Sequence, residues 1–203
     1  SSGRVPGMCS PAADLRCVAG QLGRGAPRRL SAPVYRVVTR CPWGLPAVIE
    51  SLPYAADGTP FPTLFYITCP TAAAAVGRVE DRGGVTRFVA ALAGEGEDAA
   101  RLRAALRTAT RYERRRRRSL GAGPASAGRA RALDAGAVLR AGVGGVAQPG
   151  ALKCLHCHAA HALARPGYLL GELVLAEARA AAPLWCDDAR CRQWTEEVPC
   201  ALR

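Results

Sequence analysis

The sequence predicts an α+β protein in which a small, three-stranded, mainly antiparallel sheet is covered by several helices. Residues 34–68 concentrate the β-branched and aromatic side chains typical of strands. After residue 70, Ala, Leu and Arg recur at helical spacing. Three strands leave one face of a sheet to be covered, and the helices are the natural cover.

The three predicted strands are separated by turn signals. They are residues 34–39, 47–52 and 63–68. Cys41 begins a Cys-Pro-Trp-Gly turn after the first strand, and Cys69 follows the third. In a simple meander the first and third strands run the same way, so we expect these two thiols at one edge of the sheet.

The predicted helices surround this sheet in one domain. They are residues 13–22, 71–81 with Thr71 as N-cap, 86–92, 97–118, 129–139, 151–164 and 169–182. We therefore divide the chain into a disordered N-terminus at residues 1–12, a single α+β domain at 13–182 with a flexible Gly/Ala/Arg-rich loop at 119–150, and a Cys-rich C-terminal extension at 183–203.

Composition limits the classes of protein that this sequence can represent. The formal net charge is +12, but nearly all basic residues are Arg and Lys153 is the only lysine, which indicates a GC-rich genome. No window holds the roughly 18 apolar residues of a membrane helix, and no signal peptide is visible. Nine cysteines, an odd number, argue against a complete disulfide framework. We expect a soluble, cytoplasmic protein with reduced thiols.

The most informative segment is the predicted helix at residues 151–164. All three histidines of the chain lie there, within six residues. Positions i, i+4 and i+7 of a helix share one face, so Cys154, His158 and His161 are expected on one stripe while His156 points elsewhere. Such clustering of imidazole and thiol groups indicates a site for chemistry or metal binding.

Thiolates and imidazoles suit zinc or another transition metal, which needs three or four ligands. One helix supplies two or three, so others must come from the sheet edge. The predicted metal ligands are Cys41, Cys69, Cys154, His158 and His161. An open coordination position would support hydrolysis by metal-activated water, with Lys153 or Asp57 beside the site.

Two other interpretations of the same helix remain open. Cys154 near a helix N-terminus, beside Lys153, would favour the thiolate, and His158 one turn later could act as its base in a thiol enzyme. Alternatively, the cysteines are small buried residues and the histidines bind backbone groups. Candidate catalytic residues are thus Lys153, Cys154 and Asp57, although Asp57 also suits an ordinary turn.

An arginine run offers a different function. It consists of Arg114, Arg115, Arg116, Arg117 and Arg118 at the end of the predicted helix 97–118. Such a run can hold the phosphates of nucleic acid, a nucleotide or polyphosphate, which would make the protein a non-enzymatic adaptor for an anionic partner. The alternative is a solvated helix end whose charges complement the helix dipole.

Several motifs in order resemble the domain of unknown function 501 family, a bacterial family frequent in actinobacteria. They are Arg40-Cys41-Pro42-x-Gly44-x-Pro46, Asp57-Gly58-Thr59-Pro60-Phe61-Pro62-Thr63-Leu64, Thr68-Cys69-Pro70 and Lys153-Cys154-Leu155-His156-x-His158-x-Ala160-His161. The resemblance implies a small cytosolic protein and carries no established activity. The sequence departs from the family pattern at Cys157, where a small residue is more familiar, and in the tail after Ala182.

Overall fold

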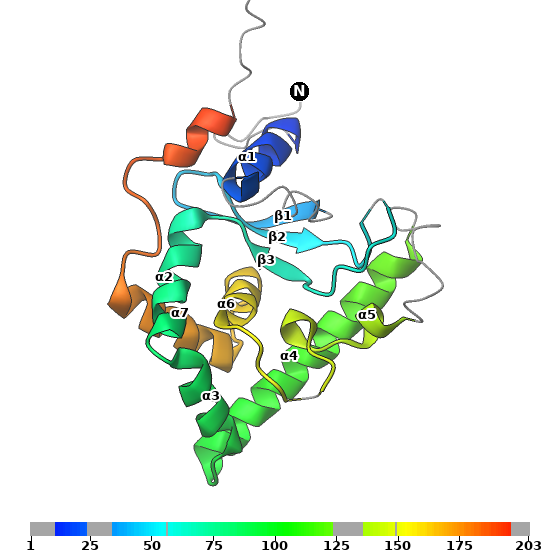
Figure 1. Cartoon of the computed structure of the whole chain (residues 1–203), viewed down its shortest axis with the longest axis vertical. Helices are drawn as coiled ribbons and strands as arrows, with labels where there is room; N and C mark the ends of the chain where they lie inside the picture. The colour runs from blue at the N-terminus through cyan, green and yellow to red at the C-terminus, as the bar shows by residue number, and fades with distance from the viewer. Residues whose placement is uncertain (1–10, 24–33, 56, 124–135, 149, 196–203) are drawn as a thin grey trace, which may run out of the picture.

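A computed structural model describes residues 11–23, 34–55, 57–123, 136–148 and 150–195. It has the predicted α+β architecture (Figure 1). The strands are β1 (Val34–Arg40), β2 (Pro46–Ser51) and β3 (Phe65–Ile67). The helices are α1 (Pro11–Gly23), α2 (Pro70–Asp81), α3 (Gly84–Ala93), α4 (Glu97–Ala122), α5 (Ala137–Arg140), α6 (Leu155–Ala164) and α7 (Leu169–Ala181), with short 3₁₀ turns η4 (Val143–Gly145) and η5 (Arg190–Trp194).

The sheet is the predicted meander, with β2 between β1 and β3 and both pairs antiparallel. Every residue of β2 is buried, because α1 packs against one face of the sheet and α6 against the other. Val48 and Phe65 belong to the main apolar core. Such burial on both faces explains why β2 reads as a nearly continuous apolar run.

Helix α6 lies at the centre of the fold. It packs against β3 and is flanked by α2 and α7, while the long helix α4 crosses the molecule nearby (Figure 1). Gly171 of α7 permits close packing here, since a Cβ at that position would collide with the carbonyl oxygen of His158. The residues of α6 are consequently held on several sides by neighbouring elements.

Several predicted boundaries differ from the observed ones. Helix α2 begins at Pro70 with Cys69 as its N-cap, so Thr71 is not the cap; proline suits the first helical position because its missing N–H would have no partner there. Helix α4 continues to Ala122, and α6 starts at Leu155 rather than at residue 151. None of the helices in the described ranges is long and apolar enough to cross a membrane.

The domain division remains a prediction, and part of it falls outside the described residues. Of the expected disordered segment 1–12, only the last two residues are described, and they belong to α1. The described part of the loop 119–150 contains the end of α4 together with α5 and η4. In the extension, η5 packs against α1, and Trp43 Nε1 donates a hydrogen bond of 2.8 Å to the Cys186 carbonyl.

Candidate metal and thiol site at the start of α6

The start of α6 gathers three side chains of metal-ligand type. Cys154 is the N-cap residue, with extended backbone angles (φ −151°, ψ 157°). Its thiol lies with His156 and with Glu80 of α2, and one donor atom from each of the three lies within 4.8 Å of the others. Among the described residues this is the group whose geometry could hold a metal ion.

Hydrogen bonds orient both partners of Cys154. His156 Nε2 lies 3.0 Å from the carbonyl oxygen of Ala73, so this nitrogen must carry a proton and donate it. His156 Nδ1 faces Glu80 Oε1 at 3.1 Å. The same Glu80 oxygen accepts a hydrogen bond from the Leu155 N–H, which caps the N-terminus of α6 with a carboxylate. Two helices thus fix one small polar site.

The Cys154 thiol is activated by its neighbours. The hydrogen bond between the Cys154 and Cys157 thiols makes the largest contribution to lowering the pKa of Cys154, to about 6, against the opposing effect of burial. The Cys157 amide lowers this pKa further, and the Glu80 carboxylate opposes it. Conversely, the hydrogen bond to Cys154 and burial raise the pKa of Cys157. Cys154 is therefore the thiolate of the pair near neutral pH.

A cavity of about 450 Å³ adjoins this cluster. Cys154, His156 and Cys157 contribute to its wall, opposite residues of β3 and α1 that include Tyr66 and Gln21. Cys154 is half-buried and the side chain of His156 is 35% exposed. A small molecule or ion in solvent can thus reach the thiolate and the imidazole.

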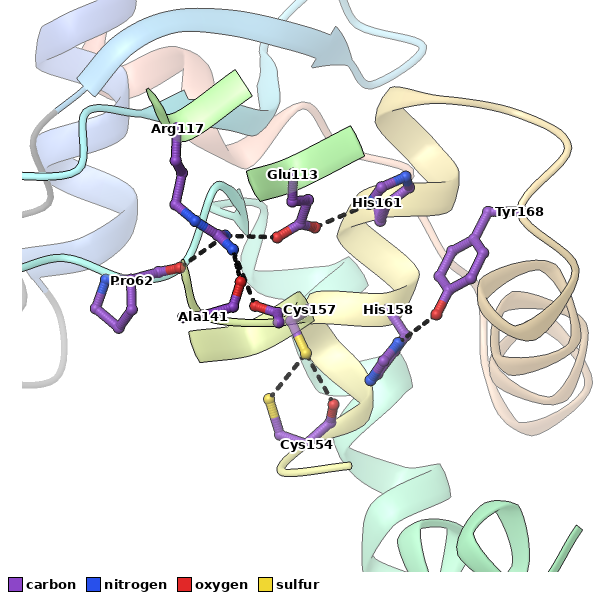
Figure 2. A network of polar contacts seen from close by, with 10 residues as sticks. Pro62, Glu113, Arg117, Ala141, Cys154, Cys157, His158, His161 and Tyr168 are labelled. Atoms are coloured by element: carbon purple, nitrogen blue, oxygen red, sulfur yellow. Dashed lines mark hydrogen bonds and ion pairs between the residues drawn. The ribbon is translucent and has the colours of Figure 1, made fainter. Parts of the chain in front are cut away.

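The other end of α6 carries a buried charge network (Figure 2). His161 Nδ1 lies 2.8 Å from Glu113 of α4, and Arg117 donates to the second oxygen of this carboxylate at 2.8 Å. The Arg117 guanidinium also donates to the carbonyl oxygens of Pro62, at 3.0 Å, and of Ala141. Arg117 Nε is the one of its nitrogens without a hydrogen-bond partner among the described residues, and the paired groups give the network a structural role joining α4, α6 and two loops.

His158 lies between these two regions and is fully buried. Its Nδ1 shares a hydrogen bond of 2.7 Å with the hydroxyl of Tyr168 (Figure 2). Within the described part of the chain, its Nε2 has no hydrogen-bond partner. Burial and the neighbouring His161 lower the pKa of His158 to about 3, so the ring is neutral at neutral pH.

Cys41 and Cys69 lie at one edge of the sheet, as the meander topology predicts. Burial raises the pKa of Cys69, against amide hydrogen bonds that lower it, and the thiols of Cys191 and Cys41 raise it further. The metal-type group at Cys154 includes neither Cys41 nor Cys69 among the described residues. Cys41 and Cys69 thus lie apart from the metal-type group at Cys154.

The predicted ligands therefore separate into three places. Cys154 lies in the group of metal-ligand type but not on the stripe with His158 and His161, because α6 begins one residue after it. Sequence reasoning missed Glu80 and set His156 aside. If the helix had been predicted to begin at Leu155 instead of residue 151, His156 would have been expected near Cys154. No sequence signal pointed to Glu80, which is 76 residues from His156.

The candidate catalytic residues other than Cys154 lie at the surface. Lys153 is exposed next to Cys154. The Asp57 carboxylate accepts hydrogen bonds from the Thr59 N–H at 2.9 Å and from the Thr59 hydroxyl at 2.8 Å. This is the Asx-type turn that the sequence suggested as the alternative role of Asp57.

The arginine run divides among three environments. Arg116 binds Glu50 of β2, with 2.6 Å between its Nε and Oε1, and Arg117 is fully buried in the Glu113 network. Arg114, Arg115 and Arg118 line a groove of about 1100 Å³ along α4. Two of the five predicted anion-binding residues are thus engaged elsewhere in the fold.

Residues 37–176 match the sequence profile of a family described as a protein of unknown function (DUF501). No curated protein and no solved structure matches the chain.

Proposed function

The chain belongs to the DUF501 family, and for this member we propose that the start of α6 binds one zinc-type transition-metal ion through Glu80, Cys154 and His156. The observation that carries the proposal is the convergence of carboxylate, thiol and imidazole donor atoms within 4.8 Å of one another. Zinc takes this combination of oxygen, sulfur and nitrogen ligands.

The hydrogen bonds of His156 fit such a ligand. A metal-bound histidine commonly donates its second ring N–H to a backbone carbonyl or carboxylate, which sets the tautomer and the ring orientation. Nε2 of His156 donates to Ala73 O, which leaves the Nδ1 lone pair facing Glu80 and Cys154. The lowered pKa of Cys154 adds to this fit, since a thiol must lose its proton to bind metal.

The ligand count also supports a reaction class. Zinc sites that catalyse reactions have three protein ligands and keep the fourth position for water, whereas structural sites are closed by four. Cys154 and His156 border a cavity of about 450 Å³ from which a substrate can approach. Hydrolysis by metal-activated water is the class that this arrangement supports. A cytoplasmic location would keep Cys154 reduced.

Elemental analysis of the untagged protein, purified under reducing conditions, tests the proposal. We expect close to one equivalent of metal per chain. Glu80→Gln and His156→Gln should each weaken metal binding by more than the roughly 10–100-fold that loss of an outer-shell partner costs. Cys186→Ser, which alters a thiol outside the cluster, should leave metal content unchanged. Metal retained in both cluster variants, or none after reconstitution, would reject the site.

The groove along α4 supports a second candidate function, binding of a phosphate-rich polyanion. Arginines at helical spacing share it with the apolar side chains of Val89, Leu92 and Leu106. Those lining it are Arg103, Arg107, Arg111, Arg114, Arg115 and Arg118. Arg111, Arg115 and Arg118 of this set are exposed to solvent, so their guanidinium groups are accessible to an anion. Several guanidinium groups along one helix face suit a chain of phosphates.

Fluorescence binding with labelled polyphosphate and with a single-stranded oligonucleotide tests the groove. Replacing Arg111, Arg115 and Arg118 together by Gln should abolish a salt-sensitive interaction. The control replaces the exposed Arg78, Arg179 and Arg192, which changes the net charge equally outside the groove. Equal loss in both triple variants would mean that net charge alone, and not this groove, binds the anion.

A further inference from the structure

Cys154 and Cys157 are a second chemical feature of the same helix end. Their sulfur atoms lie 3.7 Å apart (Figure 2), and the Cys157 Sγ also lies 3.0 Å from the Cys154 carbonyl oxygen. One residue is the N-cap and the other lies in the first turn of α6, so the sequence is a Cys-x-x-Cys motif at a helix N-terminus. This arrangement brings two thiols close enough to form a bond after a small rotation of the side chains.

The two thiols differ in access. Both contribute to the wall of the cavity, but Cys154 is half-buried whereas Cys157 is only 4% exposed. Gly144 closes the space behind Cys157: its φ is +72°, and a Cβ there would collide with the Cys157 sulfur. The Cys157 sulfur is confined between Gly144 and Cys154, so Cys154 is the more accessible thiol of the pair.

We propose that Cys154 and Cys157 form a reversible dithiol–disulfide pair that exchanges with low-molecular-weight disulfides entering this cavity. The accessible Cys154 attacks and the enclosed Cys157 resolves, a division of labour that requires one exposed and one buried thiol in contact. Nothing in this exchange requires a metal ion.

The exchange proceeds in two balanced steps. The Cys154 thiolate attacks one sulfur of the substrate disulfide, forms a mixed disulfide and releases the first thiolate, which takes a proton from water. Cys157 then attacks the Cys154 sulfur and transfers its proton to the second departing thiolate. The substrate disulfide is reduced to two thiols while the protein dithiol is oxidised to one disulfide.

One consequence rests on the proposed metal site. The intramolecular disulfide removes the Cys154 thiolate from the ligand group of Glu80 and His156, so oxidation would release a bound ion. The two proposals nevertheless depend on different partners of Cys154, because Cys157 lies outside the metal-type group and Glu80 takes no part in the exchange.

Incubation of the full chain in buffers of reduced and oxidised glutathione, with and without prior chelator treatment, tests the exchange. After alkylation, peptide mass mapping should find a Cys154–Cys157 disulfide that dithiothreitol reverses. Cys157→Ala should instead accumulate glutathione on Cys154, and Cys154→Ala should leave Cys157 reduced. Cys186→Ser should behave as the wild type.

Two variants separate this inference from the metal site. Glu80→Gln should lose metal and keep the disulfide, while Cys157→Ala should keep metal and lose the disulfide. Absence of the Cys154–Cys157 disulfide at every glutathione ratio, or no glutathione adduct on a folded Cys157→Ala protein, would overturn the exchange. Urea unfolding curves establish that each variant is folded.

Discussion

The two ends of α6 use the same kinds of side chain for different purposes. At its start, Cys154, His156 and Glu80 lie beside a cavity, with the His156 side chain 35% exposed. At its other end, His161 and Glu113 are almost fully enclosed and each carboxylate oxygen has a partner. The start of α6 is accessible to solvent, and its metal-ligand atoms lie close together. The other end of α6 is enclosed in the core.

This difference shows that residue type alone does not identify a site. A histidine whose neighbours satisfy its donors inside the core stabilises the fold, and one at a cavity with a free lone pair can take a ligand. The comparison predicts that substitutions at the closed end lower the stability of the fold. Substitutions at the open end should instead change ligand binding.

The largest effect on stability is expected at the closed end. Glu113→Ala leaves the buried Arg117 without its carboxylate, which typically costs about 3–5 kcal/mol. Urea denaturation measures the change in unfolding free energy. Glu177→Ala, which breaks a surface pair with Arg87, is the matched control and should cost less than about 1 kcal/mol. Similar costs for the two variants would contradict a structural role for the network.

A smaller and pH-dependent effect is expected at Glu50. Burial would raise its pKa, but hydrogen bonds and charges from Arg116 and Arg36 together lower it below the ordinary 4.5. The folded protein then binds this proton less readily than the unfolded chain. The stabilisation is complete above about pH 4.5 and is lost as the pH falls through the lowered folded value.

Glu50→Gln should therefore cost roughly 1–3 kcal/mol near neutral pH, as expected for a lost charged hydrogen bond. The difference from the wild type should shrink as the pH falls below 4.5. Unfolding curves from pH 7 to pH 3 measure it. A difference that stays constant over this range would argue against a charged Glu50 in the folded protein.

The smallest effect on stability is expected at the open end. Glu80→Gln keeps a side-chain oxygen for the Leu155 N–H and removes only the charge at the helix N-terminus, which is worth about 0.3–1 kcal/mol. Measured on metal-free protein, the cost should thus be well below that of Glu113→Ala. A cost as large as that of Glu113→Ala would make Glu80 a structural residue.

The sequence predicts the fold better than the site. Segments rich in β-branched and aromatic residues, with turns between them, suffice for the strand order, which places Cys41 and Cys69 at one edge. The site depends on where α6 begins, and residues 151–154 have no local signal that stops a helix. Glu80 sets that start from another helix, a tertiary effect that local patterns do not contain.

The arginine run illustrates the same limit. Its residues favour helix, and α4 does continue through them to Ala122. Successive residues of a helix point in different directions, so adjacent arginines meet different surroundings. Arg116 reaches Glu50, Arg117 enters the core and Arg118 faces the groove. Which direction is buried depends on the elements that pack around α4, and these are distant in sequence.

The contact between α1 and η5 has a consequence for biosynthesis. The Cys17 thiol donates a hydrogen bond to the Cys191 carbonyl, 174 residues further along the chain, and Trp194 lies against Gly20. While the ribosome is still synthesising the intervening residues, the first helix lacks this cover. Its apolar face would then be available to chaperones, and the nascent protein should acquire protease resistance at α1 only after η5 has left the exit tunnel.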